Sequence, residues 1–188
     1  MFGYPQTVSA RLRARDIFKM IRQEQGSLID IGCSFGGPYT FEFARRLAPH
    51  PVLGVDIDPV NIATARRLNS ELAFSNLSFE VCDVLELSPD MQQFDIAFAG
   101  EMLEVIKDDE TAIQCMGRLV KPNGLLLISA RYTENPEEYQ VEEPSVKVKN
   151  TQNYSELFVG GYFWRAGYNR HRLETLLNLA GFDVISVK

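Results

Sequence analysis

Short apolar runs alternate along most of the chain with segments in which apolar residues recur at helical spacing. The runs are nearly continuous in Ile, Val, Leu and Phe, which is typical of strands buried on both faces of a parallel sheet. The predicted strands are 28–31, 51–56, 77–81, 94–99, 125–129 and 182–187, and the predicted helices are 7–25, 39–48, 58–72, 108–119 and 169–180. This alternation predicts a three-layer α/β fold with a mostly parallel sheet and helices on both of its faces.

Side chains that can cap a helix stand directly before three of the predicted helices. Asp58, Asn169 and either Asp108 or Asp109 are placed to accept hydrogen bonds from the first free N–H groups of those helices. Pro59 suits a first helical position, because its missing N–H would have had no partner there. The starts of these helices are therefore predicted more closely than their ends.

Residues 131–168 interrupt the alternation of strands and helices. They contain 8 of the 20 aromatic residues of the chain, together with two prolines and two acidic pairs. A loop of this length inside a compact domain is usually functional, and its aromatic content favours an ordered one. We expect a cap insertion between the fifth and sixth strands that covers a substrate site; the alternative is a flap that only completes the core. The candidate substrate contacts are Tyr4, which precedes the first helix, and Tyr162, Phe163, Trp164 and Tyr168.

Composition and charge restrict the class of protein. The 188 residues are 45% hydrophobic and 23% charged, with a formal net charge of −6, which disfavours a broad nucleic-acid surface. No apolar stretch approaches the ~20 residues that span a membrane, and the N-terminus lacks the pattern of a signal peptide. Three cysteines without C-x-x-C spacing predict buried, reduced thiols. We therefore expect a cytoplasmic protein with a single domain over 1–188, whose N-terminal helix region is 1–26.

A glycine-rich turn follows the first predicted strand. Gly32, Gly36 and Gly37 lie between that strand and Pro38, which is placed at the start of the next helix. Glycines let the backbone approach a ligand, and a helix N-terminus offers free N–H groups, so this arrangement indicates nucleotide binding. The alternative is a tight turn without a ligand. A dinucleotide is one candidate, although only two of the three glycines of G-x-G-x-x-G are present.

Acidic residues at the ends of three strands bear on the choice of ligand. Asp56 ends the second strand, where a carboxylate accepts hydrogen bonds from ribose hydroxyls in several classes of nucleotide-binding protein. Asp30 stands before the first glycine, where its charge is unfavourable beside a pyrophosphate but favourable beside an ammonium group. Asp83 follows the third strand. Because carboxyl ends of parallel strands share one edge of the sheet, we expect these acids to face one crevice.

Five segments, taken in order, resemble the motifs of class I S-adenosylmethionine (SAM)-dependent methyltransferases. They are 30–36 (D-I-G-C-S-F-G), 81–84 (V-C-D-V), 94–106, 119–124 (L-V-K-P-N-G) and 176–182 (L-L-N-L-A-G-F). The resemblance implies a Rossmann-like fold, SAM as cofactor with S-adenosylhomocysteine (SAH) as product, and no metal ion. It implies cofactor contacts from the loop after the first strand, from Asp56 to the ribose, and from Asp83 with the Val84 N–H to adenine. The full implied set is Asp30, Gly32, Cys33, Ser34, Gly36, Asp56, Ile57, Asp83, Val84, Gly100 and Glu101.

This chain departs from the family pattern in three places. Ser34 replaces the middle glycine, and Val105 stands where many members carry histidine. The chain also ends after the predicted sixth strand, whereas the family usually has a seventh; a trimmed chain, a longer protein and an unusual sheet edge remain open. With that histidine absent, Glu101 at the end of the fourth strand is the first candidate for a general base, and an orienting or cofactor-contacting role is its alternative. Glu104, His171 and the tyrosine hydroxyls of the cap are further candidates.

Two absences restrict the substrate. The fourth strand is not followed by the [DN]-P-P-[YF] of amino-methylation or by the Pro-Cys of attack on cytosine. Together with the acidic charge, this favours methyl transfer to an oxygen or nitrogen of a small molecule, with no nucleic-acid partner. The alternatives are a non-catalytic SAM-fold module that binds a partner within a larger protein and a nicotinamide dinucleotide (NAD)-binding protein.

Overall fold

The computed structural model describes residues 8–22, 25–37, 39–86, 92–134, 136, 138–140, 163–165 and 167–185. For residues 8–13, 138–140 and 163–165 it describes the backbone alone. Tyr4, Tyr162 and Pro38 lie outside the described residues, so their predicted roles are not addressed by the structure.

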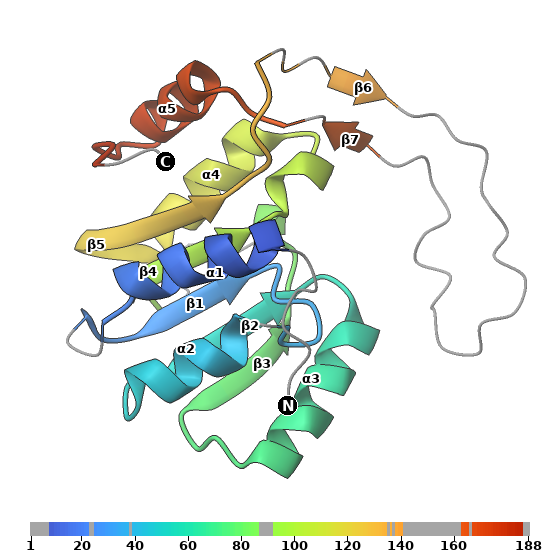
Figure 1. Ribbon diagram of the computed structural model, residues 1–188, viewed down its shortest axis with the longest axis vertical. Coiled ribbons are helices and arrows are strands. Elements are labelled where there is room, and N and C mark those ends of the chain that lie inside the picture. The colour runs from blue at the N-terminus through green and yellow to red at the C-terminus, as the bar shows by residue number, and fades with distance from the viewer. Residues whose placement is uncertain are drawn as a thin grey trace, which may run out of the picture.

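A five-stranded sheet forms the middle layer, with the strand order β3-β2-β1-β4-β5 (Figure 1). All four neighbouring pairs are parallel. The strands are β1 (Leu28–Ile31), β2 (Val52–Asp56), β3 (Leu77–Val81), β4 (Phe94–Gly100) and β5 (Val120–Ser129). The direction of winding reverses between β1 and β4, which is the position where doubly wound sheets bind ligands at the carboxyl ends of their strands. The predicted parallel α/β sheet is confirmed.

Helices cover both faces of this sheet and enclose two separate apolar cores (Figure 1). The helices are α1 (Val8–Met20), α2 (Thr40–Leu47), α3 (Pro59–Leu72), α4 (Asp109–Arg118) and α5 (Arg170–Leu179), and two short 3-10 turns are η2 (Val84–Glu86) and η3 (Leu103–Val105). One core contains buried residues of α1, α2 and α3, and the other contains those of α4, α5 and η3. Each core includes strand residues from one face of the sheet, which accounts for the near-continuous apolar runs of β1 and β4.

The predicted N-caps are present. Asp58 accepts a hydrogen bond from Val60 N at 2.8 Å, with Pro59 as the first helical residue of α3. Asn169 accepts from Arg172 N at 2.9 Å at the start of α5. Of the two candidates before α4, Asp108 is the cap and accepts from Thr111 N at 3.0 Å, whereas Asp109 is the first residue of the helix.

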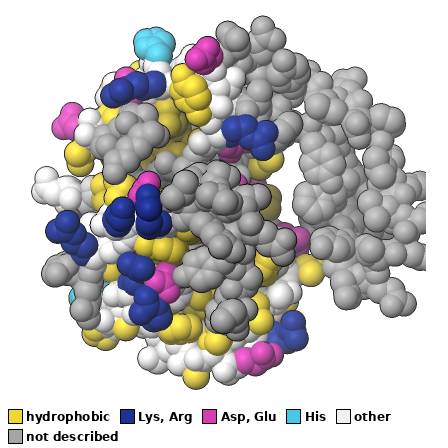
Figure 2. Space-filling view, viewed as in Figure 1, with side chains coloured by type: hydrophobic (Ala, Val, Ile, Leu, Met, Phe, Trp, Pro, Cys, Tyr) yellow, Lys and Arg dark blue, Asp and Glu magenta, His cyan; other side chains and the backbone are white. Residues whose placement is uncertain are grey.

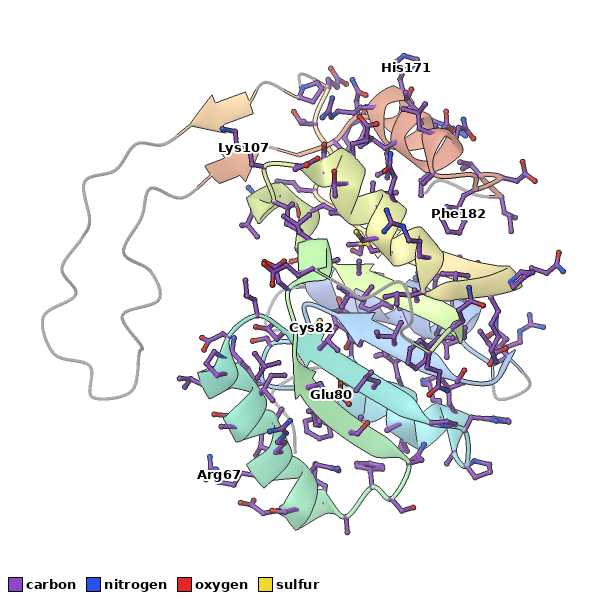
Figure 3. All side chains as sticks on the ribbon, turned by 180° about the vertical axis from the view of Figure 1, so that it is seen from behind. Arg67, Glu80, Cys82, Lys107, His171 and Phe182 are labelled. Carbon is purple, nitrogen blue, oxygen red and sulfur yellow. The ribbon has the colours of Figure 1, made fainter. Side chains whose placement is uncertain are left out.

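Two predicted boundaries and one predicted strand were wrong. α1 ends at Met20 rather than near residue 25, and β5 begins at Val120, so it includes the segment 121–124 that was expected to be a turn. The predicted last strand is not formed over residues 182–185. Phe182, the first residue of that predicted strand, contacts the end of α5 and α4 instead. Its N–H donates to Leu177 O at 3.0 Å, and its ring packs against Gly117 of α4 (Figure 3). Phe182 thus takes part in the end of α5 and not in a strand beside β5.

The segment predicted to be a cap is described only near its two ends. β6 (Glu138–Gln140) and β7 (Phe163–Arg165) form an antiparallel pair, and β7 lies against η3. Closer to the sheet, Tyr132 and Tyr168 form an isolated bridge. Residues 141–162 lie outside the described part of the chain, so the cap remains a prediction.

Surface charges of both signs are interspersed on the face that carries α1 and α2, as Figure 2 shows. Part of this mixing is local, since Arg45 and Arg46 both pair with Glu42 on α2 at 2.6 Å. In the part of the chain that the structure describes, no helix combines the length and apolar character needed to cross a membrane.

Candidate cofactor and methyl-acceptor site

The loop after β1 adopts left-handed backbone conformations at three positions. Gly32, Ser34 and Gly36 have φ values of +75°, +52° and +89°. The loop is held to β2, because Val55 O accepts hydrogen bonds from both Gly32 N (2.8 Å) and Cys33 N (3.0 Å). Ser34 therefore meets the same conformational requirement as the glycine it replaces, at a cost of about 1–2 kcal/mol for a residue with a Cβ.

Asp56 stabilises this loop from the end of β2. Its Oδ2 accepts from Ser34 N at 2.8 Å, and its Oδ1 accepts from Asp58 N at 2.9 Å and from Asn61 Nδ2 at 3.4 Å. A carboxylate has about four acceptor sites, so about one remains for a ribose hydroxyl beside these three internal bonds. Asp56 is only partly buried, which leaves it accessible to a ligand.

Asp83 and the residues near it form a second group at the same edge. Cys82 N donates to Asp56 O at 2.9 Å, which brings the ends of β2 and β3 together. Asp83 Oδ1 accepts from Leu85 N at 2.9 Å and begins η2, in which Val84 is buried. Ile57 follows Asp56 with a side chain that is 62% exposed, so it offers an apolar surface for a planar base. Figure 3 shows Cys82 at this end of the sheet.

Asp30 is placed differently from the direct ligand contact that we expected. The side chain is 3% exposed, and its Oδ2 accepts from Thr40 Oγ1 at 2.6 Å at the first residue of α2. Burial raises the pKa of the Asp30 carboxyl to about 7; the bond from Thr40 opposes this shift, and the negative charge of Asp56 adds to it. Asp30 therefore joins β1 to the first residue of α2, the two elements that flank the glycine loop. Thr40 was not predicted, because the sequence does not indicate which side chain a threonine at the start of a helix will contact.

The three cysteines are free, as predicted. Cys33 and Cys115 are buried, whereas Cys82 is only half-buried. Burial, followed by the negative charges of Asp30 and Asp56, raises the pKa of the Cys33 thiol well above its usual range. Cys33 can therefore contribute to a ligand site through its backbone but not as a thiolate.

The loop after β4 lies against the glycine loop. Met102 lies so close to Gly32 that a Cβ on the glycine would be 3.1 Å from the Met102 Cβ. Glu101 is exposed and has a φ of +56°, while its N–H donates to Ser129 O at 2.6 Å. A non-glycine residue in this conformation is often found at functional sites, where surrounding bonds hold it. The structure thus brings Gly100 and Glu101 to the edge that carries Asp56 and Asp83.

The predicted substrate contacts are not brought together in the same way. Tyr168 is 2% exposed, and its hydroxyl lies 3.1 Å from both Leu103 O and Asp109 Oδ2. This buried placement differs from the exposed pocket lining that we expected, because the aromatic ring completes the core under α4 and α5. Phe163 and Trp164 are described in backbone only, within β7. His171, a minor candidate, is exposed on the outer side of α5, away from the strand ends (Figure 3).

Known proteins identify the family. A family profile described as a methyltransferase domain matches residues 22–181. The chain belongs to this methyltransferase domain family. The class I SAM-dependent assignment implied by the five motifs is thereby confirmed, together with SAM as the cofactor of the family.

Similar proteins include ubiquinone biosynthesis O-methyltransferases. The domain is 29% identical over 163 residues to the mitochondrial one of Bos taurus, which covers 85% of this chain and 42% of the relative. It is 28% identical over 166 residues to that of Neisseria meningitidis, covering 86% of this chain and 65% of the relative. The chain thus spans roughly half the length of these curated relatives, 42% and 65%.

Solved structures with little sequence identity share the fold. The [4+2]-cyclase SpnF has a TM-score of 0.68 and 21% identity, covering 98% of this chain and 65% of that one. Coclaurine N-methyltransferase, bound to N-methylheliamine and SAH, has a TM-score of 0.58 and 18% identity, covering 68% of this chain and 39% of that one. At these identities the similarity establishes the fold and not the reaction.

The residues of this methyltransferase domain fit SAM. Asp56 is an accessible carboxylate with about one unused acceptor site, Ile57 is an exposed apolar neighbour, and the loop Gly32–Gly36 follows the end of β1. These residues would hold the ribose, one face of adenine and the amino-acid end. When bound, SAM supplies a methyl group that is activated by the positive sulfonium. Among the described residues, no cluster of three or more His, Cys, Asp or Glu is arranged to hold a metal ion.

Proposed function

We propose that this domain transfers the methyl group of SAM to an oxygen, or alternatively a nitrogen, of a small molecule. The observation that carries the proposal is the convergence of the glycine loop, Asp56, Asp83 and Glu101 at one sheet edge of a methyltransferase domain. The O-methyltransferases among the similar proteins favour oxygen as the acceptor. The interspersed surface charges and the net charge of −6 favour a small molecule over nucleic acid.

Asp56 and the glycine loop that it holds are proposed to orient SAM toward the acceptor. Methyl transfer is an in-line displacement, and holding the two reactants in line is worth several kcal/mol or more, on the order of 7–11 kcal/mol in the best cases. Ser34 N and Asp58 N hold the Asp56 carboxylate in one orientation, so its remaining acceptor site has a fixed direction. The residues of the domain therefore mainly position the acceptor and exclude water.

Glu101 is the proposed general base. Bound SAM would supply the methyl carbon to the acceptor oxygen and leave as neutral SAH, and the acceptor hydroxyl would lose its proton. Glu101 accepts the proton that leaves the acceptor hydroxyl. Its exposure at the edge of the sheet gives it access to that proton, and the bond from Glu101 N to Ser129 O holds its backbone.

The acceptor itself is proposed to lie between Glu101 and the side of β7. Phe163 and Trp164 are retained as candidate contacts because β7 lies against η3, which directly follows the Glu101 loop. Tyr4 and Tyr162 remain candidates from sequence. Tyr168 is replaced as a candidate by its role in the core.

A non-catalytic module remains the second candidate. It is favoured by the part-length coverage of the curated relatives. Both candidates predict that SAM or SAH binds. They differ in whether a methyl group is transferred.

The test measures transfer from SAM labelled in its methyl group. The full chain is incubated with a panel of phenols, catechols, hydroxy acids and amines, and both labelled product and SAH are quantified. We expect transfer to at least one hydroxyl compound, and expect it to be abolished in Glu101→Gln if Glu101 is the base. Binding of SAH without transfer to any acceptor would support the module, and failure to bind SAM or SAH would overturn both candidates.

A further inference from the structure

Three hydrogen bonds tie the loop after β4 to the two chain segments that lead into and out of 134–166. Glu101 N donates to Ser129 O at 2.6 Å at the end of β5. Glu104 Oε1 accepts from Arg131 N, two residues further along. Tyr168 donates its hydroxyl to Leu103 O at 3.1 Å, from the segment that leads into α5. We call Glu104 and Tyr168, with these bonds, the clasp.

The clasp is buried, and Asp109 and Arg172 form further hydrogen bonds beside it. Glu104 is 5% exposed and Tyr168 is 2% exposed. The Tyr168 hydroxyl also lies 3.1 Å from Asp109 Oδ2, and Arg172 Nη2 donates to both oxygens of Asp109 at 3.1 and 3.0 Å. Tyr168 N donates to Arg131 O at 2.7 Å, so the two segments are also bound to each other. Groups held by this many bonds have little freedom to change position.

Glu104 is placed to position its neighbours and not to exchange protons with a substrate. Its second carboxylate oxygen, Oε2, is buried and has no hydrogen-bond partner among the described residues. A substrate hydroxyl cannot reach an atom that is enclosed by protein. Its first oxygen, Oε1, is taken by the Arg131 N–H. Glu104 therefore acts through the backbone that it holds.

The clasp holds the loop after β4, which carries Glu101, the proposed base for the methyl acceptor. Leu103 and Glu104 directly follow Glu101 and Met102, and Met102 packs against Gly32 of the cofactor loop. A shift of Leu103 or Arg131 would thus reach both Glu101 and the glycine loop. A displacement of about 1 Å at such a position can lower turnover about a hundredfold.

We propose that Glu104 and Tyr168 are positioning residues that hold Glu101 in line for methyl transfer. The inference rests on the proposed function and deepens it, because it assigns the second glutamate of the E-M-L-E segment a different task from the first. In this assignment the Glu104 side chain works as a hydrogen-bond acceptor, and its negative charge is not needed.

The test compares variants that keep or remove the acceptor. Glu104→Gln keeps an oxygen that can accept from Arg131 N, whereas Glu104→Ala removes it. Tyr168→Phe keeps the ring in the core and removes only the hydroxyl. Glu110→Ala, at an exposed acid on α4, is the matched control. For each full-length variant, kcat, the KM for SAM, the affinity for SAH and amide hydrogen exchange over 100–106 are measured.

We expect Glu104→Ala and Tyr168→Phe to lower kcat about tenfold or more, while the KM for SAM and the affinity for SAH change less than about twofold. Exchange over 100–106 should rise in both variants. Glu104→Gln and Glu110→Ala should keep kcat within about threefold of the parent and leave exchange unchanged. This pattern separates positioning from general loss of structure, which would lower the SAH affinity as well.

Two results would overturn the proposal. If Glu104→Gln loses as much turnover as Glu104→Ala, the charge of Glu104 is what matters and it acts in acid–base chemistry. If exchange over 100–106 is unchanged in Glu104→Ala and Tyr168→Phe, the clasp does not hold the loop. The exchange measurement needs no acceptor, so it tests the clasp even if the domain transfers no methyl group and the proposed function fails.

Discussion

At the scale of single residues, the carboxylates at the strand ends differ in what surrounds them. Asp56 is partly exposed and holds three internal hydrogen-bond donors, whereas Asp30 is enclosed and bonded to Thr40. Asp83 holds Leu85 N at the start of η2. Three residues of one chemical type therefore differ in what they hold: Asp30 bonds to the start of α2, Asp56 to the glycine loop and Asp83 to the first turn of η2.

Replacing Asp56 by alanine should weaken SAH binding by about 1.5–3 kcal/mol, because ribose hydroxyls lose a charged acceptor. Asp83→Ala should cost less, since the backbone of Val84 and the apolar surface of Ile57 remain. Isothermal titration calorimetry on both variants measures the difference, with Asp56→Asn as the control that keeps one acceptor oxygen. An SAH affinity unchanged in Asp56→Ala would mean that β2 does not end at the ribose.

Asp30 should make the free energy of unfolding depend on pH. Its pKa is about 7 in the folded protein, compared with 3.8 for an ordinary aspartate. Below about pH 4 both folded and unfolded forms carry the proton; from about pH 4 to pH 7 only the folded form keeps it, so stability falls as pH rises. Relative to Asp30→Asn, the parent should lose up to about 4 kcal/mol across this range, at about 1.4 kcal/mol per pKa unit.

Urea unfolding of the parent and Asp30→Asn at several pH values measures this difference. Acids that do not interact with Asp30 contribute equally to both proteins and cancel in the comparison. Asp95 has the opposite sign, because burial is outweighed by hydrogen bonds from Lys121 and Ser27 that lower its pKa to about 2. A difference between parent and variant that does not change from pH 4 to pH 7 would show that Asp30 is ionised throughout.

At the scale of elements, the starts of the helices follow local chemistry. Asn169 accepts a hydrogen bond from an N–H group of α5 that has no partner within the helix. Donor and acceptor are three residues apart, so this contact depends on the local sequence. Helix ends depend more on packing. The Phe182 ring packs against Gly117 of α4, and this contact favours the end of α5 just before Phe182.

Asn169→Ala should lower the free energy of unfolding by about 0.5–2 kcal/mol, because that N–H loses its acceptor. Asn178→Ala, in the last turn of the same helix, serves as the control and should be neutral or slightly stabilising, since alanine is the better helix former. Chemical denaturation with circular dichroism gives both values. Equal effects in the two variants would argue against the cap.

Trp164→Ala tests the place of β7 in the proposed site. If the side of β7 lines the acceptor position, this variant should leave the SAH affinity within about twofold and lower kcat or raise the KM for the acceptor by about tenfold. Titration with SAH and turnover of the best acceptor from the panel are the two measurements. Unchanged kinetics would place the acceptor elsewhere along the sheet edge.

At the scale of the whole molecule, cofactor binding links parts that meet only in the folded sheet. A ligand that binds the folded state alone stabilises it by about 2.7 kcal/mol at a hundredfold excess over its Kd. For a domain of this size that raises the melting temperature by about 5–10 °C. We expect SAH to produce such a rise in a thermal-shift measurement and NAD at the same concentration to produce none. The reverse result would favour a dinucleotide site.

The sequence alone determined most of the local features: the strands and helices, three N-caps, and the glycine loop with Asp56 and Asp83 at strand ends. These depend on periodicity, capping chemistry and backbone conformation within a few residues, which the order of amino acids specifies directly. Only the tertiary structure decided the depth of each group. It enclosed Asp30 with Thr40, buried Tyr168 among α4 and α5, paired Glu104 with Arg131 N and used Phe182 to cap α5. Burial and the choice of partner, 10 residues away for Asp30 and 27 for Glu104, depend on how the layers pack, and the spacing of residues along the chain does not contain that information.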